Sequence, residues 1–247
     1  MPTEIIGICL IKNEEVFINQ IIKNILNFCD TILVLNNNSI DNTVCEISNI
    51  NSDKIVLIDV ENPNDTNKYL QKFVGTNKWV FGVDGDELYN PDKLKLLRKE
   101  ILNGEWDDFS MLRHNGIHTF KIAEGKAYGY ASPPSRHVGK LYNFAHFRGQ
   151  LPRAERLHGM TFDNNINASK THTDLTLDQK EKLNEYMYML HLVFMKRTSV
   201  INFNKYINND DNELWMSSSP ATNSSKYKID NYTKGNSISI PINGYFD

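Results

Sequence analysis

Four short apolar segments alternate with helix-like segments in the first third of the chain, and this alternation restricts the folds open to it. The apolar segments are Ile5–Ile11, Thr31–Leu35, Lys54–Val60 and Lys78–Val83. Their length and their β-branched residues are typical of buried strands. Strands that alternate with helices favour a mostly parallel sheet with helices on both faces. We therefore predict an α/β fold.

The segments between and after these strands predict helices. Ile18, Ile21, Ile22 and Ile25 are spaced as one apolar face of a helix. A short polar residue before an apolar helical pattern is a typical cap, and Asp41 occupies such a position. One further helix is expected directly after Asp41. Three more are expected at Asn67–Gly75, Pro91–Asn103 and Asp178–Phe194.

The middle third of the chain has a different pattern. Short strand candidates separated by turns follow one another there: Phe109–Arg113, Gly116–Ile122, Ala127–Tyr130 and Lys140–Phe144. We interpret them as a mixed-sheet extension that covers one edge of the parallel sheet. A last strand-like segment, Ser237–Ile242, lies in a polar tail that either forms a mobile arm or wraps around the core. We divide the chain into one domain over residues 1–198, which includes a C-terminal helix, and an arm over residues 199–247.

Charge and composition exclude several classes of protein. The chain has 247 residues, enough for one α/β domain of ordinary size, and a net charge of −3. This balance leaves no basic footprint for nucleic acid. No apolar run reaches the length of a membrane span and the N-terminus lacks a signal-peptide pattern, so we expect a cytoplasmic protein. Its three cysteines, Cys9, Cys29 and Cys45, are then expected to be buried, reduced thiols.

The fourth apolar segment ends in the acidic turn Asp84-Gly85-Asp86-Glu87. Carboxylates are costly to bury without a partner, so these side chains are expected to face water or a cation. In open α/β sheets, ligands bind at the carboxyl ends of the strands. Two aspartates around a glycine can hold a hard divalent ion while the backbone approaches a phosphate closely. For this segment taken alone, an acidic surface turn without function is the alternative.

Two further polar segments follow strands of the same predicted sheet. Lys12-Asn13-Glu14-Glu15 follows the first strand, and Asn36-Asn37-Asn38-Ser39-Ile40-Asp41-Asn42-Thr43 follows the second. In a parallel sheet these segments and the acidic turn point to one edge. In this order the three motifs resemble those of the nucleotide-sugar-dependent glycosyltransferases of family 2, which have the Rossmann-like GT-A fold. The resemblance covers roughly residues 4–175.

The resemblance implies a nucleotide-sugar site with a divalent metal ion. Its nucleotide-binding residues would be Lys12, Asn13, Glu14, Asn36, Asp41, Asp84 and Gly85. Asp84 would touch the ribose or a metal-bound water, and Asp86 would ligate Mn²⁺ or Mg²⁺ on the diphosphate. The dication would stabilise the negative charge that the leaving nucleoside diphosphate gains. The family usually has aspartate at the position of Asn36, so one charge is missing there and the identity of the nucleotide is left open.

Two more motifs lie downstream. Glu155-Arg156-Leu157-His158-Gly159 and Lys170-Thr171-His172-Thr173 are similar to segments in one branch of the family, where the later histidine can complete the metal site. The resemblance therefore implies that His172 joins Asp84 and Asp86 as a metal ligand. A loop histidine without a ligand is the alternative for His172.

The resemblance also implies an inverting transfer to a hydroxyl acceptor, which is a glycan or a lipid-linked sugar. A displacement of this kind needs a carboxylate to take the acceptor proton. Glu155 is the candidate for this base, and His158 and Asp174 are its rivals. We assign catalytic roles to two residues, Glu155 and Asp84.

Two other functions fit parts of the sequence. Haloacid-dehalogenase phosphatases also have Asp-x-Asp after an apolar strand, but they carry it on their first strand and have Thr or Val where this chain has Leu88. A GT-A module that binds a nucleotide or glycan without turnover is compatible with Asn36. We expect no nucleic-acid partner and no membrane span. The sugar, the acceptor and the oligomeric state are left open.

Overall fold

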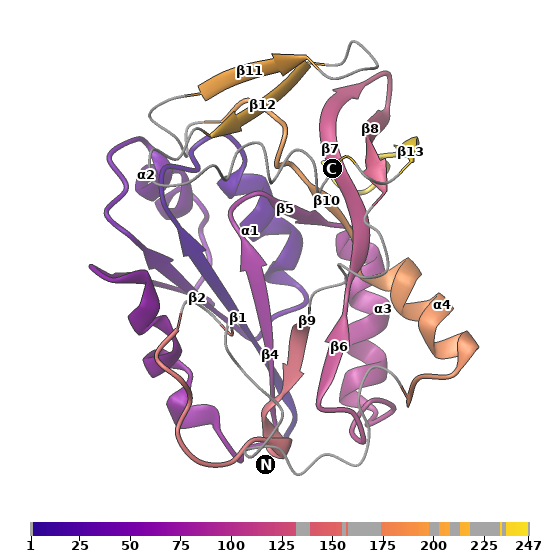
Figure 1. Cartoon of the computed structure of the whole chain (residues 1–247). Coiled ribbons are helices and arrows are strands. Elements are labelled where there is room, and N and C mark those ends of the chain that lie inside the picture. Colours follow the sequence, from indigo (N-terminus) through magenta and orange to yellow (C-terminus); the bar gives the residue numbers. More distant parts are fainter. Residues whose placement is uncertain are drawn as a thin grey trace.

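The computed structural model describes residues 2–131, 139–154, 157, 174–197, 203–207, 213–217, 233 and 236–246. Within these residues the chain forms a six-stranded sheet, a five-stranded sheet and a two-stranded ribbon (Figure 1). Helices pack on the six-stranded sheet.

The six-stranded sheet contains the four parallel strands that the alternation predicts. In the order β3-β2-β1-β4-β9-β6 the first four strands are parallel, and β9 runs antiparallel to β4 and β6. The bounds are β1 Glu4–Ile11, β2 Thr31–Asn36, β3 Ile55–Asp59, β4 Lys78–Asp84, β6 Met111–Arg113 and β9 Gly139–Asn143. The expected α/β fold with a mostly parallel central sheet is confirmed.

The five-stranded sheet contains two of the four strands expected in the mixed extension, those at Gly116–Ile122 and Ala127–Tyr130, whereas the other two are β6 and β9 of the six-stranded sheet. The order of the five-stranded sheet is β13-β8-β7-β10-β5, in which β10 is parallel to β7 and the other pairs are antiparallel. The bounds are β5 Glu87–Tyr89, β7 Asn115–Ala123, β8 Lys126–Ala131, β10 Tyr188–His191 and β13 Ser237–Pro241. The ribbon of β11, Phe203–Ile207, and β12, Glu213–Ser217, lies at the end of the molecule toward which β1 and β4 point (Figure 1).

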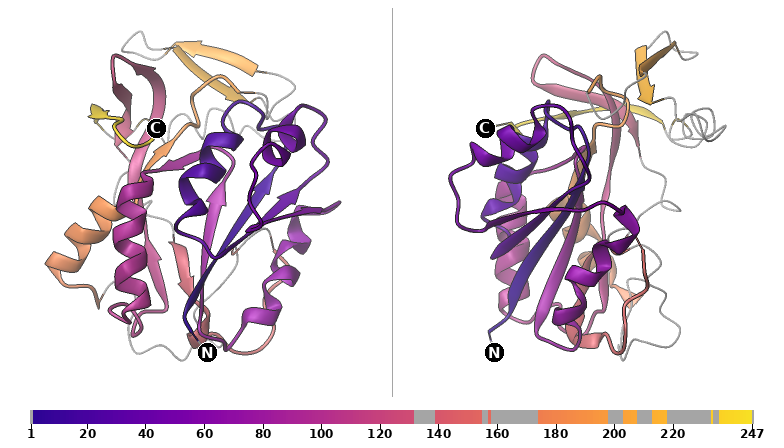
Figure 2. Two further views of the ribbon diagram at one scale, coloured as in Figure 1. Left: turned by 180° about the vertical axis from the view of Figure 1, so that it is seen from behind. Right: turned by 90° about the vertical axis from the view of Figure 1, so that its left-hand side faces the viewer.

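Helices cover both faces of the six-stranded sheet, and β1 shows why. Ile5, Cys9 and Ile11 belong to the core shared with α1 and α3, whereas Ile6 and Ile8 belong to a second core on the other face. The bounds are α1 Ile18–Leu26, α2 Thr43–Ser48, α3 Pro91–Leu102 and α4 Leu177–Tyr186, with 3₁₀ helices η1 Pro63–Tyr69, η2 Gln71–Phe73 and η4 Phe144–His146. The right-hand view of Figure 2 shows the sheet from the side, with helices on both of its faces. In the described part of the chain, no helix combines the length and hydropathy that crossing a membrane needs.

The long helix expected at Asp178–Phe194 is wrong in its second half. α4 ends at Tyr186, and β10 then enters the five-stranded sheet between β7 and β5. Met189 and Leu190 point to opposite faces of β10, and both are buried. A strand covered on both faces is apolar throughout, so the spacing of its apolar residues does not distinguish it from a buried helix. The strand brings His191 next to β5, which follows the acidic turn.

Three smaller expectations have different outcomes. The short helix expected at Asn67–Gly75 is replaced by η1 and η2, which begin earlier, at Pro63. Cys9 and Cys29 are buried as expected, but Cys45 is exposed. The strand expected in the tail is confirmed as β13, which pairs with β8.

An ion pair between Asp30 and Arg98 fixes α3 to the sheet. Arg98 donates to both carboxylate oxygens, with Nη2–Oδ1 at 2.6 Å and Nη1–Oδ2 at 3.1 Å, and to the carbonyl of Phe28. The backbone N–H of Ile5 donates to Oδ2 of the same carboxylate at 2.8 Å. Burial acts to raise the pKa of Asp30, but the bonds from Arg98 and Ile5 outweigh it and hold this pKa below its ordinary value. The charged form of Asp30 therefore stabilises the fold.

We predict that Asp30→Asn lowers the free energy of unfolding by about 1 kcal/mol at neutral pH, because asparagine keeps the shape but loses the charge-assisted bonds. A carboxyl group with a lowered folded-state pKa stabilises above its unfolded value of about 3.9 and loses this contribution as the pH falls through the folded value. The gap between wild type and variant should therefore narrow as the pH falls below the unfolded value of about 3.9, and it should close once the pH is below the folded value. Urea denaturation across this range measures the gap, and a gap that does not change with pH would contradict the assignment.

Candidate functional site

Four strand ends meet at one edge of the six-stranded sheet. The register pairs Leu10 with Asp84, Ile11 with Asn36, and Asn36 with Asp59. The loops after β1 and β2 therefore leave the sheet beside the acidic turn, as expected for parallel strands. We call this region, formed by the ends of β1 to β4 and the loops that follow, the carboxyl edge; the arrowheads of β1 and β4 point to it in Figure 1.

Hydrogen bonds between the first two loops fix their shape. Asn13 has a positive φ of 55°, and its Oδ1 accepts from the N–H of Ile40 at 2.8 Å. The N–H of Asn13 donates to the hydroxyl of Ser39 at 3.0 Å. The N–H of Glu14 donates to Thr43 Oγ1 at 2.7 Å. Asn13 and Glu14, both predicted to bind the nucleotide, are thus held against the loop that follows β2.

Asn36 binds a carboxylate although it replaces the aspartate of the family pattern. Its Nδ2 donates to Asp59 Oδ1 at 2.8 Å, and its Oδ1 accepts from the N–H of Ser39 at 3.1 Å. Asp59 is the last residue of β3 and is exposed. The negative charge at this position of the edge is therefore supplied by the neighbouring strand.

Asp41 organises the start of α2, as the sequence suggested. Its Oδ1 accepts from the N–H and the hydroxyl of Thr43, and its Oδ2 accepts from the N–H of Glu15 at 3.3 Å. The cap position itself is Asn42, whose side chain makes no capping bond. Asp41 thus provides the cap from one residue earlier and also joins the loops after β1 and β2.

Lys140 from β9 neutralises one half of the acidic turn. Its Nζ lies 3.0 Å from Asp84 Oδ2 and 2.7 Å from Glu87 Oε1, and only 7% of its side chain is exposed. Glu87 also accepts from the N–H of Asp84 at 3.0 Å. Burial and the charge of Asp84 raise the pKa of Glu87 to about 7, against the opposing effect of Lys140. The buried carboxylates of the turn therefore depend on a lysine from another strand.

The other half of the acidic turn is held by the segment after β10. Arg197 Nη1 contacts Asp86 Oδ2, and His191 Nε2 lies 3.3 Å from the same oxygen. The N–H of Leu192 donates to the backbone carbonyl of Asp86 at 2.7 Å. Burial acts to raise the pKa of Asp86, but Arg197 and His191 hold this pKa well below its usual range. Asp86 is therefore a carboxylate at neutral pH.

Glu14 connects the loop after β1 to the acidic turn. Its Oε2 lies 3.8 Å from Arg197 Nη1, so one guanidinium approaches both Glu14 and Asp86. Gly85 permits this approach, because a Cβ atom at its position would lie 2.6 Å from Glu14 Cγ. The motif glycine therefore serves the packing of two loops.

A second histidine lies behind His191. The Nδ1 atoms of His118 and His191 are 3.0 Å apart, and His118 is buried. One of these two nitrogens carries the proton of the bond and the other accepts it. The tautomer that His191 presents to Asp86 is therefore coupled to the tautomer of His118.

Much of the predicted site is brought together. The predicted residues that lie at the carboxyl edge are Asn13, Glu14, Asn36, Asp41, Asp84, Gly85 and Asp86. Lys12 is exposed at the end of β1, and Asp174 is exposed just before α4. Glu155, His158 and His172 lie outside the described residues, so their roles stay predictions.

Three charged or titratable residues of the edge were missed by the sequence analysis: Lys140, His191 and Arg197. Lys140 opens a predicted strand, where a lysine is more typical of a solvated end. His191 was assigned to a helix. If residues 188–191 had been predicted as a strand, His191 would have stood at the end of that strand, where ligand-binding residues are often found.

The donors around Asp86 suit a divalent metal ion. The carboxylate oxygen of Asp86 and the imidazole Nε2 of His191 lie 3.3 Å apart, close enough to contact one ion, and Mn²⁺ accepts both kinds of ligand. Ions that bind phosphates often have one or two protein ligands and complete their shell with phosphate oxygens and water. Among the residues that the structure describes, no three His, Cys, Asp or Glu side chains form a complete cage. The donor set therefore fits an ion shared with a bound ligand.

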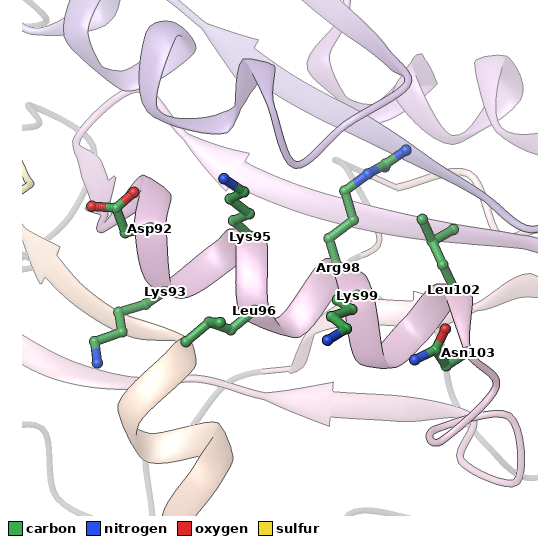
Figure 3. Close-up of a pocket in the computed structure, with 8 residues that line it drawn as sticks. All are labelled: Asp92, Lys93, Lys95, Leu96, Arg98, Lys99, Leu102 and Asn103. Atoms are coloured by element: carbon green, nitrogen blue, oxygen red, sulfur yellow. The ribbon is translucent and has the colours of Figure 1, made fainter.

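A hollow of about 680 Å³ lies elsewhere, along α3 (Figure 3). Its lining includes Asp92, Lys93, Lys95, Leu96, Arg98, Lys99, Leu102 and Asn103. These residues belong to one helix and its end, and the Arg98 guanidinium is already bound to Asp30. Polar groups from several strands converge at the carboxyl edge, so we place the candidate site there.

Comparison with known proteins gives partial matches to solved structures. No protein-family model and no curated protein matches the chain. Two structures of glucosyl-3-phosphoglycerate synthase from Mycobacterium tuberculosis, one with Mn²⁺, UDP and glucosyl-3-phosphoglycerate and one with Mn²⁺ and UDP-glucose, match with TM-scores of 0.34 and 0.33 and identities of 17% and 18%. Each match covers 47% of this chain and 44% of the synthase. Mannose-6-phosphate isomerase from Helicobacter pylori matches with a TM-score of 0.35 and 13% identity, over 53% of this chain and 56% of the isomerase.

We predict that Lys140→Met lowers the free energy of unfolding by about 3 kcal/mol at neutral pH, because it leaves the buried Glu87 and the half-buried Asp84 without their counter-charge. Lys182→Met is a matched control, since Lys182 also pairs with a glutamate, Glu100, but the side chain of Lys182 is 39% exposed. The control should have little effect. Chemical denaturation measures both variants, and equal losses would show that Lys140 does not compensate a buried charge.

Proposed function

We propose that this protein is a metal-dependent glycosyltransferase that moves a sugar from a nucleoside-diphosphate sugar to a hydroxyl group of a glycan or a lipid-linked sugar. The observation that supports it is the meeting of three family-like motifs at one edge of a mostly parallel sheet. Glu14 and Asp86 follow different strands, yet both approach the same guanidinium. Such convergence is typical of a ligand site and is not needed for a surface turn.

In this proposal the carboxyl edge binds the sugar donor. Asn13, Asn36 and Asp41, in the loops after β1 and β2, hold the base and ribose. The acidic turn faces the diphosphate, and Asp86 and His191 hold Mn²⁺ or Mg²⁺. When bound, this ion supplies Lewis-acid stabilisation of the charge on the leaving diphosphate. Asp84 would lie beside the ribose, and His172 would be a further metal ligand.

Burial of the acidic turn is what would keep these groups in place. Lys140 is bound by two carboxylates, and the backbone carbonyl of Asp86 accepts a hydrogen bond from the N–H of Leu192. Groups held in this way do not need to reorganise when charge develops on the leaving group. The acidic turn therefore provides a fixed charge pattern for the reaction.

We further propose an inverting in-line displacement in which Glu155 is the base. The acceptor hydroxyl gives its proton to a carboxylate as its oxygen bonds to the anomeric carbon and the bond to the diphosphate oxygen breaks. Asp84 is paired with Lys140, and Asp86 is paired with Arg197. This engagement favours a carboxylate from outside the acidic turn.

A module that binds a nucleotide or glycan without turnover is the second candidate function. The ion pairs on Asp84 and Asp86 favour it, because both motif carboxylates already have protein cations as partners. Hydrolysis of the donor, or transfer to any acceptor, distinguishes the enzyme from the binding module.

We predict that UDP, GDP or dTDP, or a sugar conjugate of one of them, raises the melting temperature of the protein when Mn²⁺ is present, and that EDTA removes this effect. A ligand that binds only the native state stabilises it. Asp86→Asn should abolish the metal-dependent shift, because it removes a charged metal ligand. Thermal unfolding with a panel of nucleotides is the measurement.

Asp53→Asn is the matched control for Asp86→Asn. Asp53 is an exposed aspartate before β3, at the opposite end of the strands. The control should keep the full shift. If no nucleotide shifts the melting temperature under any metal condition, or if both variants keep the shift, the donor site is not at the carboxyl edge.

We also predict that Glu155→Gln keeps donor binding but lowers the transfer rate by about a hundredfold, since glutamine has the same size and no basicity. NMR of the product should show an anomeric configuration opposite to that of the donor. Retention of configuration would overturn the displacement mechanism. A wild-type rate in the variant would instead move the base to Asp174 or His158.

A further inference from the structure

Arg197 lies beside the carboxylates of Asp86 and Glu14, at the place where a metal ion bound to Asp86 would lie. Backbone bonds fix the chain from Leu192 to Met195, two residues before Arg197: Leu192 donates to Asp86 at 2.7 Å and Phe194 donates to Thr119 at 3.3 Å. The Arg197 side chain is only 13% exposed. A buried arginine with fixed backbone on its N-terminal side is part of the built structure and is not a solvated surface group.

Asp86 Oδ2 carries two contacts from this part of the chain. Arg197 Nη1 contacts it directly, and His191 Nε2 approaches it at 3.3 Å. Arg197 Nη1 also lies 3.8 Å from Glu14 Oε2. Burial acts to lower the pKa of Arg197, but Asp86 and Glu14 more than compensate, so the guanidinium keeps its charge. The guanidinium therefore neutralises two carboxylates from two loops.

A divalent ion on the same oxygen is incompatible with this contact. An ion that ligates Asp86 Oδ2 would lie within a few ångströms of the Arg197 charge, and like charges at that distance repel strongly in a buried site. His191 does not conflict in this way, because its imidazole is itself a metal ligand when neutral. Binding of a metal ion therefore requires the guanidinium to leave Asp86.

We propose that Arg197 is a built-in counter-cation, which holds Glu14 and Asp86 in the metal-free protein and moves to the diphosphate when a divalent ion takes its place. This inference rests on the proposed function. The guanidinium suits both positions, because its planar fork binds carboxylates and phosphates alike. The negative diphosphate would reach the edge together with the metal ion, so the displaced arginine remains beside an anion.

The proposal predicts that Arg197→Gln changes the affinities for Mn²⁺ and for UDP in opposite directions. In Arg197→Gln the metal ion has no competitor, so Mn²⁺ alone should bind about tenfold more tightly than in wild type. UDP added at saturating Mn²⁺ should bind about tenfold more weakly, because one partner of the diphosphate is lost. An arginine with only a structural role would not produce this reversal.

Isothermal titration of the full chain with Mn²⁺, followed by titration with UDP or GDP at saturating Mn²⁺, measures both effects. Lys196→Gln is the matched control, because Lys196 is adjacent and carries the same charge but lies 5.2 Å from the centre of the Trp215 ring. It should behave as wild type. Asp86→Asn should lose Mn²⁺ binding, which identifies the titrated site.

Arg197→Lys is a second variant in case Arg197→Gln does not fold, which circular dichroism will show. A lysine keeps the charge but, as a point charge without the fork, does not bridge two carboxylates as arginine does. Its Mn²⁺ affinity should lie between those of wild type and Arg197→Gln. If both Arg197 variants bind Mn²⁺ no more tightly than wild type, Arg197 is not the counter-cation that the metal ion replaces. Unchanged UDP affinity in Arg197→Gln overturns the transfer of Arg197 to the diphosphate.

Failure of the inference and failure of the proposed function give different results. If wild type binds Mn²⁺ and nucleotide at Asp86 and the Arg197 variants do not differ from it, the inference fails and the proposed function stands. If Mn²⁺ binds neither wild type nor the Arg197 variants, or binds Asp86→Asn as well as wild type, both fail.

Discussion

The neutralisation of buried carboxylates in the acidic turn is the interaction on which the carboxyl edge depends. Asp86 and Glu87 are 8% and 3% exposed, and a carboxylate at such depth is strongly destabilising unless it is paired. Lys140 and Arg197 provide the pairing, and they come from β9 and from the segment after β10. The turn therefore reaches its final geometry only when both sheets are assembled, which ties the candidate site to the completed fold.

The junction between β5 and β10 is what joins the two sheets at this point. β5 follows the acidic turn directly, and the register pairs its Glu87 with His191. On the other side of β10, Gly116 of β7 pairs with Met189, and a Cβ atom on Gly116 would lie 2.2 Å from the Met189 carbonyl oxygen. β7 therefore needs glycine at this position for β10 to lie so close. Backbone pairing thus fixes His191, and with it the start of the segment that carries Arg197.

The sequence predicted the half of the site that local pattern determines. Strand ends and their polar loops are contiguous motifs, so Asn13, Asp41 and Asp84 were found without the structure. The cations were not found, because each acts far along the chain from its partner: Lys140 binds Asp84 across 56 residues. No spacing rule connects such residues, and the apolar run that contains β10 fits a helix as well as a buried strand.

The charge balance at the carboxyl edge favours a ligand that arrives together with a cation. Lys140 and Arg197 offset much of the charge of the acidic turn, while Asp59 and Asn36 keep a carboxylate at the neighbouring strand end. A free diphosphate would meet these carboxylates and be repelled. A diphosphate that carries a divalent ion would bring a positive charge to Asp86 and Glu14. This charge would replace that of Arg197 when the guanidinium moves away. In the proposed exchange, the metal ion and the arginine swap anionic partners, so that neither Asp86 nor Glu14 would be left without a cation.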